Sequence, residues 1–210
     1  MNPEDGIIVM DHPLLRVWMT TLRDVRSSTG IFRLTLNRIA ALLATEATRH
    51  FETSIISVTT PIKETTGAQL SRPIVLVPIL RAGLGLVDGM LPLLSDAVVA
   101  HIGIARNEET AAPEPYYAKL PACLPDAEVL VVDPMLATGG SACEALQQLK
   151  AAGASRLTLV TVVSCPEGIA AVRAAHPEVR LVTAVVDEGL NERCYIVPGL
   201  GDAGDRYFGT

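Results

Sequence analysis

The sequence predicts an α/β protein in which helices flank a mainly parallel, twisted sheet. Short apolar runs predict buried strands, and helix-forming stretches separate several of them, which is the pattern of parallel sheets covered on both faces. The predicted strands are 74–79, 97–104, 129–132, 157–163 and 179–186, and the predicted helices between them are 82–91, 141–152 and 166–175. A length of 210 residues suits one domain.

The N-terminal part is predicted to be largely helical over residues 14–50, because Leu36, Ile39 and Leu43 recur at helical spacing. Residues 54–60 are β-branched and predict a strand. Two capping-box patterns predict helix starts. They are Ser141-x-x-Glu144 and Ser164-x-x-Glu167, the second with Pro166 in the first turn.

Two segments are predicted to lie outside the repeating pattern. Residues 107–125 contain four prolines and predict a mobile hairpin or lid, whose closure would exclude water from a bound substrate. Residues 187–210 are rich in glycine, but interleaved apolar residues such as Ile196 and Phe208 predict an ordered tail folded onto the body.

Composition excludes several classes of function. Apolar residues make up 49% of the chain and aromatic residues 4%, so the core is aliphatic. A net charge of −6 argues against sequence-independent binding of nucleic acid, although a local basic pocket remains compatible with it. The four cysteines lack metal-ligand spacing, which favours buried, reduced thiols in a cytoplasmic protein. Neither a basic leader nor an apolar run of membrane-spanning length is present, so we expect no membrane partner.

Residues 133–141 are the most informative segment. They follow the strand 129–132 and lead into a predicted helix, so their backbone N–H groups can converge on one anion at the positive end of a helix dipole. Thr138 and Ser141 add hydroxyl donors, and Asp133 adds an acceptor that suits the hydroxyls of a sugar phosphate. The familiar glycine-rich phosphate motifs are absent from this turn, and an ordinary connection between strand and helix is the alternative.

Two arginines follow two other predicted strands. Arg81 stands where a helix begins, a position that is unfavourable for a cation unless an anion is bound nearby. Arg106 follows the next strand, and together the two guanidinium groups could hold a diphosphate. The alternatives are ordinary charged residues: a surface Arg81 that pairs with an acid such as Asp88, and a solvated Arg106 that pairs with Glu108 or Glu109.

Asp202 lies between glycines in the tail, where the backbone can approach a ligand closely. The alternative is a turn aspartate that accepts a hydrogen bond from its own backbone two residues on. The four histidines do not cluster, so they are interpreted as structural or surface residues.

Several segments of the chain, taken together, resemble the uracil phosphoribosyltransferases over nearly the whole length. They are His12-Pro13-Leu14, residues 78–84, Arg106-Asn107-Glu108-Glu109-Thr110, residues 133–141, Pro166-Glu167-Gly168-Ile169 and residues 195–205. Most phosphoribosyltransferases carry two adjacent acids where this chain has Asp133-Pro134, whereas the uracil enzymes resemble this chain.

The resemblance implies a phosphoribosyltransferase fold with a small base-binding hood formed by residues 187–210. It also implies transfer of the phosphoribosyl group from 5-phosphoribosyl 1-diphosphate to N1 of uracil, giving UMP and diphosphate, with Mg²⁺ carried by the sugar diphosphate. The implied sugar-phosphate residues are Asp133, Pro134, Met135, Leu136, Ala137, Thr138, Gly139, Gly140 and Ser141. Those for the diphosphate are Arg81 and Arg106, and those for uracil are Ile196, Gly201, Asp202 and Ala203.

Four of these residues, Arg81, Arg106, Asp133 and Asp202, are the expected catalytic residues. Asp202 is also expected near the sugar diphosphate or its metal, and no residue is expected to bind the metal directly. A nucleotide-sensing regulatory protein of the same fold is the alternative from another class, and transfer to another base is a second one.

The family further implies a homo-oligomer, either a dimer or a tetramer, and GTP is a candidate effector because it activates some relatives. The chain departs from the family pattern at three positions. Thr45 and Ala105 replace common tyrosines, and Cys194 replaces a usual glycine before Tyr195, which we expect to alter the uracil loop slightly.

Overall fold

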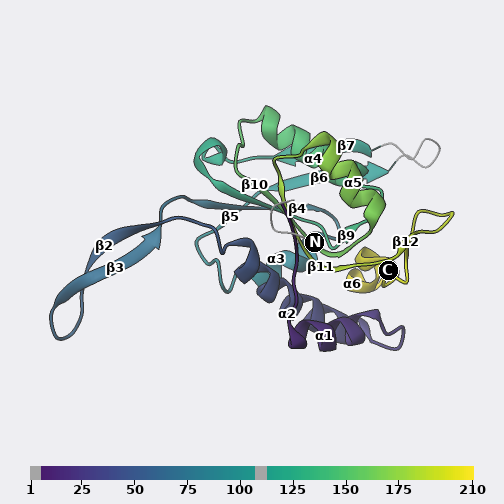
Figure 1. Ribbon diagram of the computed structural model, residues 1–210, viewed down its shortest axis with the longest axis horizontal. Helices are drawn as coiled ribbons and strands as arrows, with labels where there is room; N and C mark the ends of the chain where they lie inside the picture. Colours follow the sequence, from purple (N-terminus) through teal and green to yellow (C-terminus); the bar gives the residue numbers. More distant parts are fainter. Residues whose placement is uncertain (1–5, 107–112) are drawn as a thin grey trace.

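The computed structural model describes residues 6–106 and 113–210. Its centre is a nine-stranded sheet with the strand order β1-β11-β10-β8-β4-β6-β7, in which β5 pairs with β4 and β9 with β10 (Figure 1). The strands are β1 (Ile7–Val9), β4 (Ile74–Leu80), β5 (Val98–Val99), β6 (His101–Arg106), β7 (Pro113–Lys119), β8 (Glu128–Val132), β9 (Met135–Leu136), β10 (Leu157–Ser164) and β11 (Arg180–Val186). Every pairing in this sheet is parallel except that of β6 with β7, so the predicted fold class is confirmed.

Helices cover both faces of the sheet. On one face lie α1 (Pro13–Arg23), α2 (Thr29–Ala47) and α3 (Leu84–Met90), and on the other lie α4 (Gly140–Ala151) and α5 (Pro166–Ala175) (Figure 1). Alternate residues of β8 therefore enter different cores: Leu130 and Val132 pack with α1–α3, and Val129 and Val131 pack with α4 and α5. This two-sided burial explains why the central strands read as continuous apolar runs.

Both predicted capping boxes are wrong. The cap of α4 is Gly139 and not Ser141, and Gly139 has a φ of 82°. The cap of α5 is Cys165, because Ser164 is still part of β10, where its hydroxyl lies 2.8 Å from that of Thr161 and donates to that of Thr183. The helix bounds themselves agree with the predicted ones to within two residues.

The N-terminal helical region is divided into α1 and α2. His12 caps α1 by accepting a hydrogen bond from the Leu14 amide, which agrees with its structural interpretation. The predicted strand is present as β2 (Thr53–Thr59), but it pairs antiparallel with a strand that the sequence did not predict, β3 (Glu64–Leu70). The two strands form an arm that extends away from the body (Figure 1), with Ile55 82% exposed and Ile62 90% exposed.

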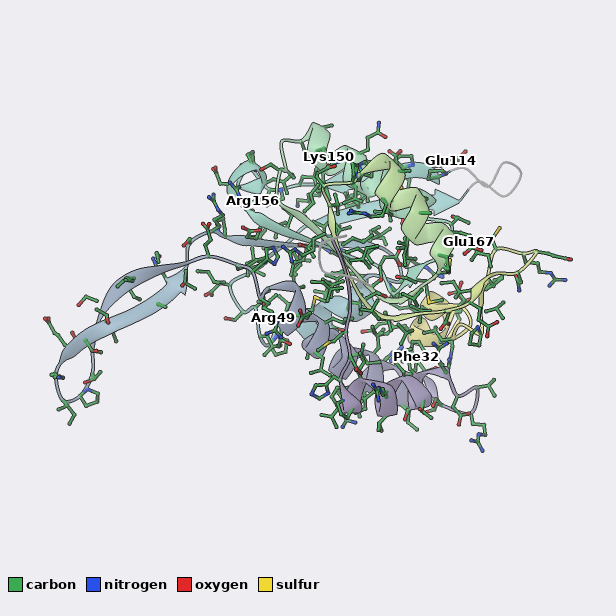
Figure 2. All side chains as sticks on the ribbon, viewed as in Figure 1. Phe32, Arg49, Glu114, Lys150, Arg156 and Glu167 are labelled. Carbon is green, nitrogen blue, oxygen red and sulfur yellow. The ribbon has the colours of Figure 1, made fainter. Side chains whose placement is uncertain are left out.

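The tail, residues 187–210, is ordered as predicted and forms a hood beside α1 and α2 (Figure 1). It contains β12 (Gly189–Leu190), β13 (Ile196–Val197) and α6 (Ala203–Phe208). Arg206 fastens it by donating to the carbonyls of Leu22, Leu200 and Asp24 at 2.6–2.8 Å. The same guanidinium group lies over the ring of Phe32, the α2 residue labelled in Figure 2.

Two further features complete the described chain. A short 3₁₀ helix, Leu124–Asp126, precedes β8. No helix among residues 6–106 and 113–210 is long and apolar enough to cross a membrane.

Candidate active site

The sheet brings the predicted site residues to the carboxyl ends of its strands. β8 ends at Val132, β9 follows within four residues, and α4 begins at Gly140, so residues 133–141 form a tight loop, which we call the phosphate loop. This loop lines a cavity of about 160 Å³. In the described chain, the amides of Thr138, Gly139 and Ser141 donate no hydrogen bond to protein groups, which leaves these donors at the positive end of α4 for an anion.

Gly139 determines the shape of the phosphate loop. Its φ of +82° is in the left-handed region, and a Cβ there would lie 2.9 Å from the Ala171 Cβ and 3.0 Å from the Gly168 carbonyl oxygen. Two independent constraints, conformation and close packing on α5, therefore require glycine at this position.

Asp133 lies at the entrance of the phosphate loop, and its carboxylate accepts a hydrogen bond from the Met135 amide at 3.3 Å. Burial raises the pKa of Asp133 to about 7; the Met135 amide works against this rise, and the negative charge of Asp202 adds to it. Asp133 therefore titrates close to neutral pH.

Arg81 directly follows β4, three residues before α3 begins. Its Nη2 lies 3.5 Å from Asp205 Oδ1, and its guanidinium group lies over the Phe208 ring. Arg81 is therefore an exposed arginine paired with an acid, as the alternative describes, but its partner is Asp205 and not Asp88, which accepts a hydrogen bond from the Tyr207 hydroxyl at 2.8 Å. With 60% of its side chain exposed, Arg81 is available to an incoming anion.

The turn that carries Arg81 packs directly against the end of β8. A Cβ on Gly83 would lie 2.4 Å from the Val132 carbonyl oxygen, so only glycine allows this approach. Since Val132 immediately precedes Asp133, this contact sets the spacing between the Arg81 turn and the phosphate loop.

Arg106 is the last residue of β6, which pairs with β4 and so ends near Arg81. The side chain of Arg106 and residues 107–112 lie outside the described residues, and with them its alternative partners, Glu108 and Glu109. β6 pairs antiparallel with β7, and Pro113 at the start of β7 lies beside Gly140 of the phosphate loop. The lid function stays a prediction.

The predicted uracil residues lie together in the hood. Ile196 and Ala203 are buried, and Gly201 has a φ of 81°. Asp202 is exposed and caps α6 by accepting a hydrogen bond from the Asp205 amide at 2.9 Å. The bonded amide is three residues further along the chain, whereas the alternative of a turn aspartate expected one two residues further. Gly204 packs beside Ala82, next to Arg81, so the hood and the Arg81 turn are adjacent.

Cys194, where the resemblance leads us to expect glycine, has a φ of 61°, which is the left-handed conformation that favours glycine. A residue with a Cβ is therefore unfavourable at this position in the loop between β12 and β13. All four cysteines are free, as expected, but only Cys165 is buried.

Sequence reasoning missed several residues that hold the site together. Arg23 on α1 pairs with Asp187 at the start of the hood, and Cys165, Glu167 and Gly168 contact the phosphate loop or the hood. Asp187 directly follows a predicted strand, as Asp133 does, and Arg81 comes shortly after another one. This position at a strand end could have identified Asp187 as a candidate site residue. Nothing in the local sequence of Arg23 identifies its partner.

Comparison with known proteins agrees with this arrangement. The model of the uracil phosphoribosyltransferase family matches residues 9–210. The chain belongs to this family. A uracil phosphoribosyltransferase of Acholeplasma laidlawii is 50% identical over 204 residues, which cover 97% of this chain and 98% of the relative. One from Salinibacter ruber is 47% identical over 206 residues, or 98% of both chains.

Solved structures give the same fold. A protein from Aquifex aeolicus superposes with a TM-score of 0.92 at 37% identity and covers 96% of this chain and 97% of its own. The adenine phosphoribosyltransferase of Leishmania donovani has a TM-score of 0.62 at 15% identity, covering 90% and 87% of the two chains, and shares the overall fold.

Proposed function

We propose that the protein transfers the phosphoribosyl group of 5-phosphoribosyl 1-diphosphate to N1 of uracil, giving UMP and diphosphate. The observation that carries this proposal is the joint placement of the phosphate loop, the Arg81 turn and the hood in a chain of the uracil phosphoribosyltransferase family. The adenine phosphoribosyltransferase shares only its fold with this protein. The proposed specificity for uracil is therefore inferred from the family and from the hood.

The phosphate loop suits the sugar phosphate. The free amides at the start of α4 would hold the 5′-phosphate, with the Thr138 and Ser141 hydroxyls as further donors. Asp133 would accept hydrogen bonds from the ribose hydroxyls. These contacts fix the sugar so that its anomeric carbon faces the hood, which turns the reaction into one between prealigned groups.

Departure of the diphosphate leaves positive charge on the ribose ring and adds negative charge to the leaving group. Arg81 and Arg106 would bind that leaving group, and guanidinium forks suit phosphate oxygens because they donate in pairs. Because the charge develops in the transition state, these contacts strengthen as the bond breaks.

No group of three or more His, Cys, Asp or Glu side chains in the described residues could hold a metal ion. The resemblance implies an Mg²⁺ that arrives on the sugar diphosphate, and the exposed carboxylate of Asp202 would be the protein oxygen near it. Bound there, Mg²⁺ would neutralise part of the charge of the leaving group.

The hood would recognise uracil through backbone groups of Ile196 and of residues 201–203. Uracil presents O4 as an acceptor and N3–H as a donor, whereas cytosine reverses both, so fixed backbone partners would be left unpaired by cytosine. A strong general base is unnecessary because uracil N1–H is fairly acidic, and Asp202 is the nearest candidate acceptor.

The arm is the natural contact element of the proposed homo-oligomer. Its two strands extend from the body (Figure 1), and Ile55 and Ile62 expose apolar surface there, as interface elements do. Sedimentation of the wild type and of an Ile55→Lys/Ile62→Lys variant, each with and without GTP, tests both the oligomer and the candidate effector.

The proposed activity is tested by conversion of radiolabelled uracil to UMP with 5-phosphoribosyl 1-diphosphate and Mg²⁺. Asp133→Asn and Arg81→Ala should each remove most of the turnover, and Arg16→Ala, which changes an exposed arginine of α1, should not. Replacing uracil with labelled cytosine should give no product. Near-normal turnover by both site variants would refute the site assignment, and no UMP from the wild type would refute the function.

A further inference from the structure

The first turn of α5 contacts both halves of the site, the phosphate loop and the hood. Cys165 caps the helix and Pro166 begins it, while Glu167 contacts Leu190 of the hood and Gly168 packs against the phosphate loop. Figure 2 labels Glu167 at the end of α5 that lies next to the hood. None of these residues reaches the cavity of the phosphate loop, so their effect on a substrate would pass through the elements they hold.

The phosphate loop rests on this turn from behind. The Cys165 thiol is fully buried and lies 3.0 Å from the Ala137 carbonyl oxygen and 3.5 Å from that of Leu136, while its amide donates to the Leu136 carbonyl at 3.2 Å. Burial raises the pKa of Cys165, which keeps the thiol protonated as a donor.

Gly168 completes this support. A Cβ at Gly168 would lie 2.5 Å from the Ala137 carbonyl oxygen and 2.7 Å from that of Leu136. Since these atoms belong to backbone that cannot yield without moving the phosphate loop, the position of the loop depends on the position of α5.

Glu167 holds the hood from the same turn. Its Oε1 accepts a hydrogen bond from the Leu190 amide at 3.1 Å, and Gly189 packs close enough that a Cβ there would lie 3.0 Å from that oxygen. Leu190 is paired in the sheet with Ile196, a residue proposed to meet uracil. A shift of α5 would therefore move both the sugar-phosphate side and the base side.

We propose that residues 165–168 are a positioning unit that sets the distance between the phosphate loop and the hood, and so couples binding of the sugar phosphate to binding of uracil. This inference rests on the proposed function. Cys165 and Glu167 act through neighbouring elements, so they are positioning residues and not catalytic ones. If this turn had only a structural role, changes in it would lower the stability of the fold without changing the binding of either substrate.

Matched pairs of variants test the inference, with both substrates varied in the UMP assay. Cys165→Ala removes the thiol donor, and Glu167→Ala removes the acceptor, whereas Cys165→Ser and Glu167→Gln keep a donor and an acceptor. We expect Cys165→Ala to raise the KM for 5-phosphoribosyl 1-diphosphate and Glu167→Ala to raise the KM for uracil, each by roughly 3- to 10-fold, the effect of one lost hydrogen bond. The conservative variants should stay within about twofold of the wild type.

Calorimetric binding of ribose 5-phosphate gives a readout that needs no turnover. If the unit couples the two sides, Glu167→Ala, which removes the contacts of this carboxylate with the hood and with Cys165, should also weaken ribose 5-phosphate binding, and Glu167→Gln should not. Unchanged binding and unchanged KM values in Glu167→Ala would overturn the inference, as would variants that only lower the unfolding temperature. If the wild type forms UMP but Glu167→Ala raises only the KM for uracil and leaves ribose 5-phosphate binding unchanged, the coupling is refuted and the proposed function stands.

Discussion

Arg23 on α1 and Asp187 at the end of β11 form a two-bond ion pair, with nitrogen-to-oxygen distances of 2.6 and 2.7 Å. The Asp187 side chain is only 6% exposed and also accepts a hydrogen bond from the Gly199 amide, while Arg23 donates to the Gly199 carbonyl. Both ends of the segment that contains β12 and β13 are thereby fixed to α1.

Asp187→Ala should lower the free energy of unfolding by roughly 2–4 kcal/mol, because it leaves a partly buried guanidinium group and the Gly199 amide unpaired. It should also raise the KM for uracil, since the hood loses its attachment. Urea denaturation measures the first effect. Arg16→Ala, which removes an ion pair whose two side chains are more than 70% exposed, is the control and should cost less than about 1 kcal/mol. A loss of similar size in both variants would contradict the assignment.

Asp133→Asn should stabilise the folded protein at pH 8 while it removes activity. The folded-state pKa of about 7 lies above the ordinary value of 3.8, so the fold favours the protonated carboxyl. That stabilisation is complete below about pH 4 and is lost as the pH rises to about 7. An asparagine carries no charge to desolvate, so the variant should gain roughly 2–4 kcal/mol at pH 8 and nothing near pH 4. Urea denaturation at the two pH values measures this difference, and an equal change at both would show that the Asp133 carboxyl does not titrate as described.

Cys194→Gly should stabilise the protein. A φ of 61° costs a residue with a Cβ roughly 1–2 kcal/mol, and the greater freedom of glycine in the unfolded chain offsets about half of that gain. We expect a net gain of about 0.5–1 kcal/mol in thermal denaturation. Cys194→Ala keeps a Cβ and removes the thiol, so it should give no gain; a similar gain in both would assign the effect to the sulfur.

Asp205→Asn should lower the KM for 5-phosphoribosyl 1-diphosphate by about two- to threefold, because it removes the charge that holds Arg81 at 3.5 Å when the diphosphate is absent. The asparagine oxygen can still accept the hydrogen bond from the Thr210 hydroxyl, which limits disturbance of the hood. The effect should diminish as salt is added. Asp11→Asn, just before α1, serves as the control, and a raised KM in Asp205→Asn would show that Asp205 helps to bind the substrate.

Periodicity in the sequence was enough to predict the central strands of the sheet and its helices, because those strands are buried on both faces and Pro166 marks the start of α5. The shorter strands β1 and β9 and the exposed edge strand β7 were not predicted. β3 escaped prediction because most of its residues are exposed on both faces and show no apolar alternation. The predicted cap of α4, Ser141, was wrong because the position of Gly139 is fixed by contacts with α5. In the sequence α5 is separated from α4 by the strand β10, so the local pattern does not reveal these contacts.

The chemistry-bearing residues at strand ends were accessible to sequence reasoning, whereas their partners were not. Arg81 contacts Asp205 and Arg23 contacts Asp187, over separations of 124 and 164 residues. Local pattern carries no information about such pairs. The same limit applies to Cys165 and Gly168, whose contacts with Leu136 and Ala137 arise only when α5 packs beside the phosphate loop.

The attachment of the hood to α1 also supplies an optical probe. The only tryptophan of the chain, Trp18, lies on α1 and packs against the core that the hood residues Leu200 and Tyr207 share. Its fluorescence emission should therefore change when the hood detaches and water reaches that region. Stopped-flow mixing with uracil or UMP could follow this motion without a chemical label.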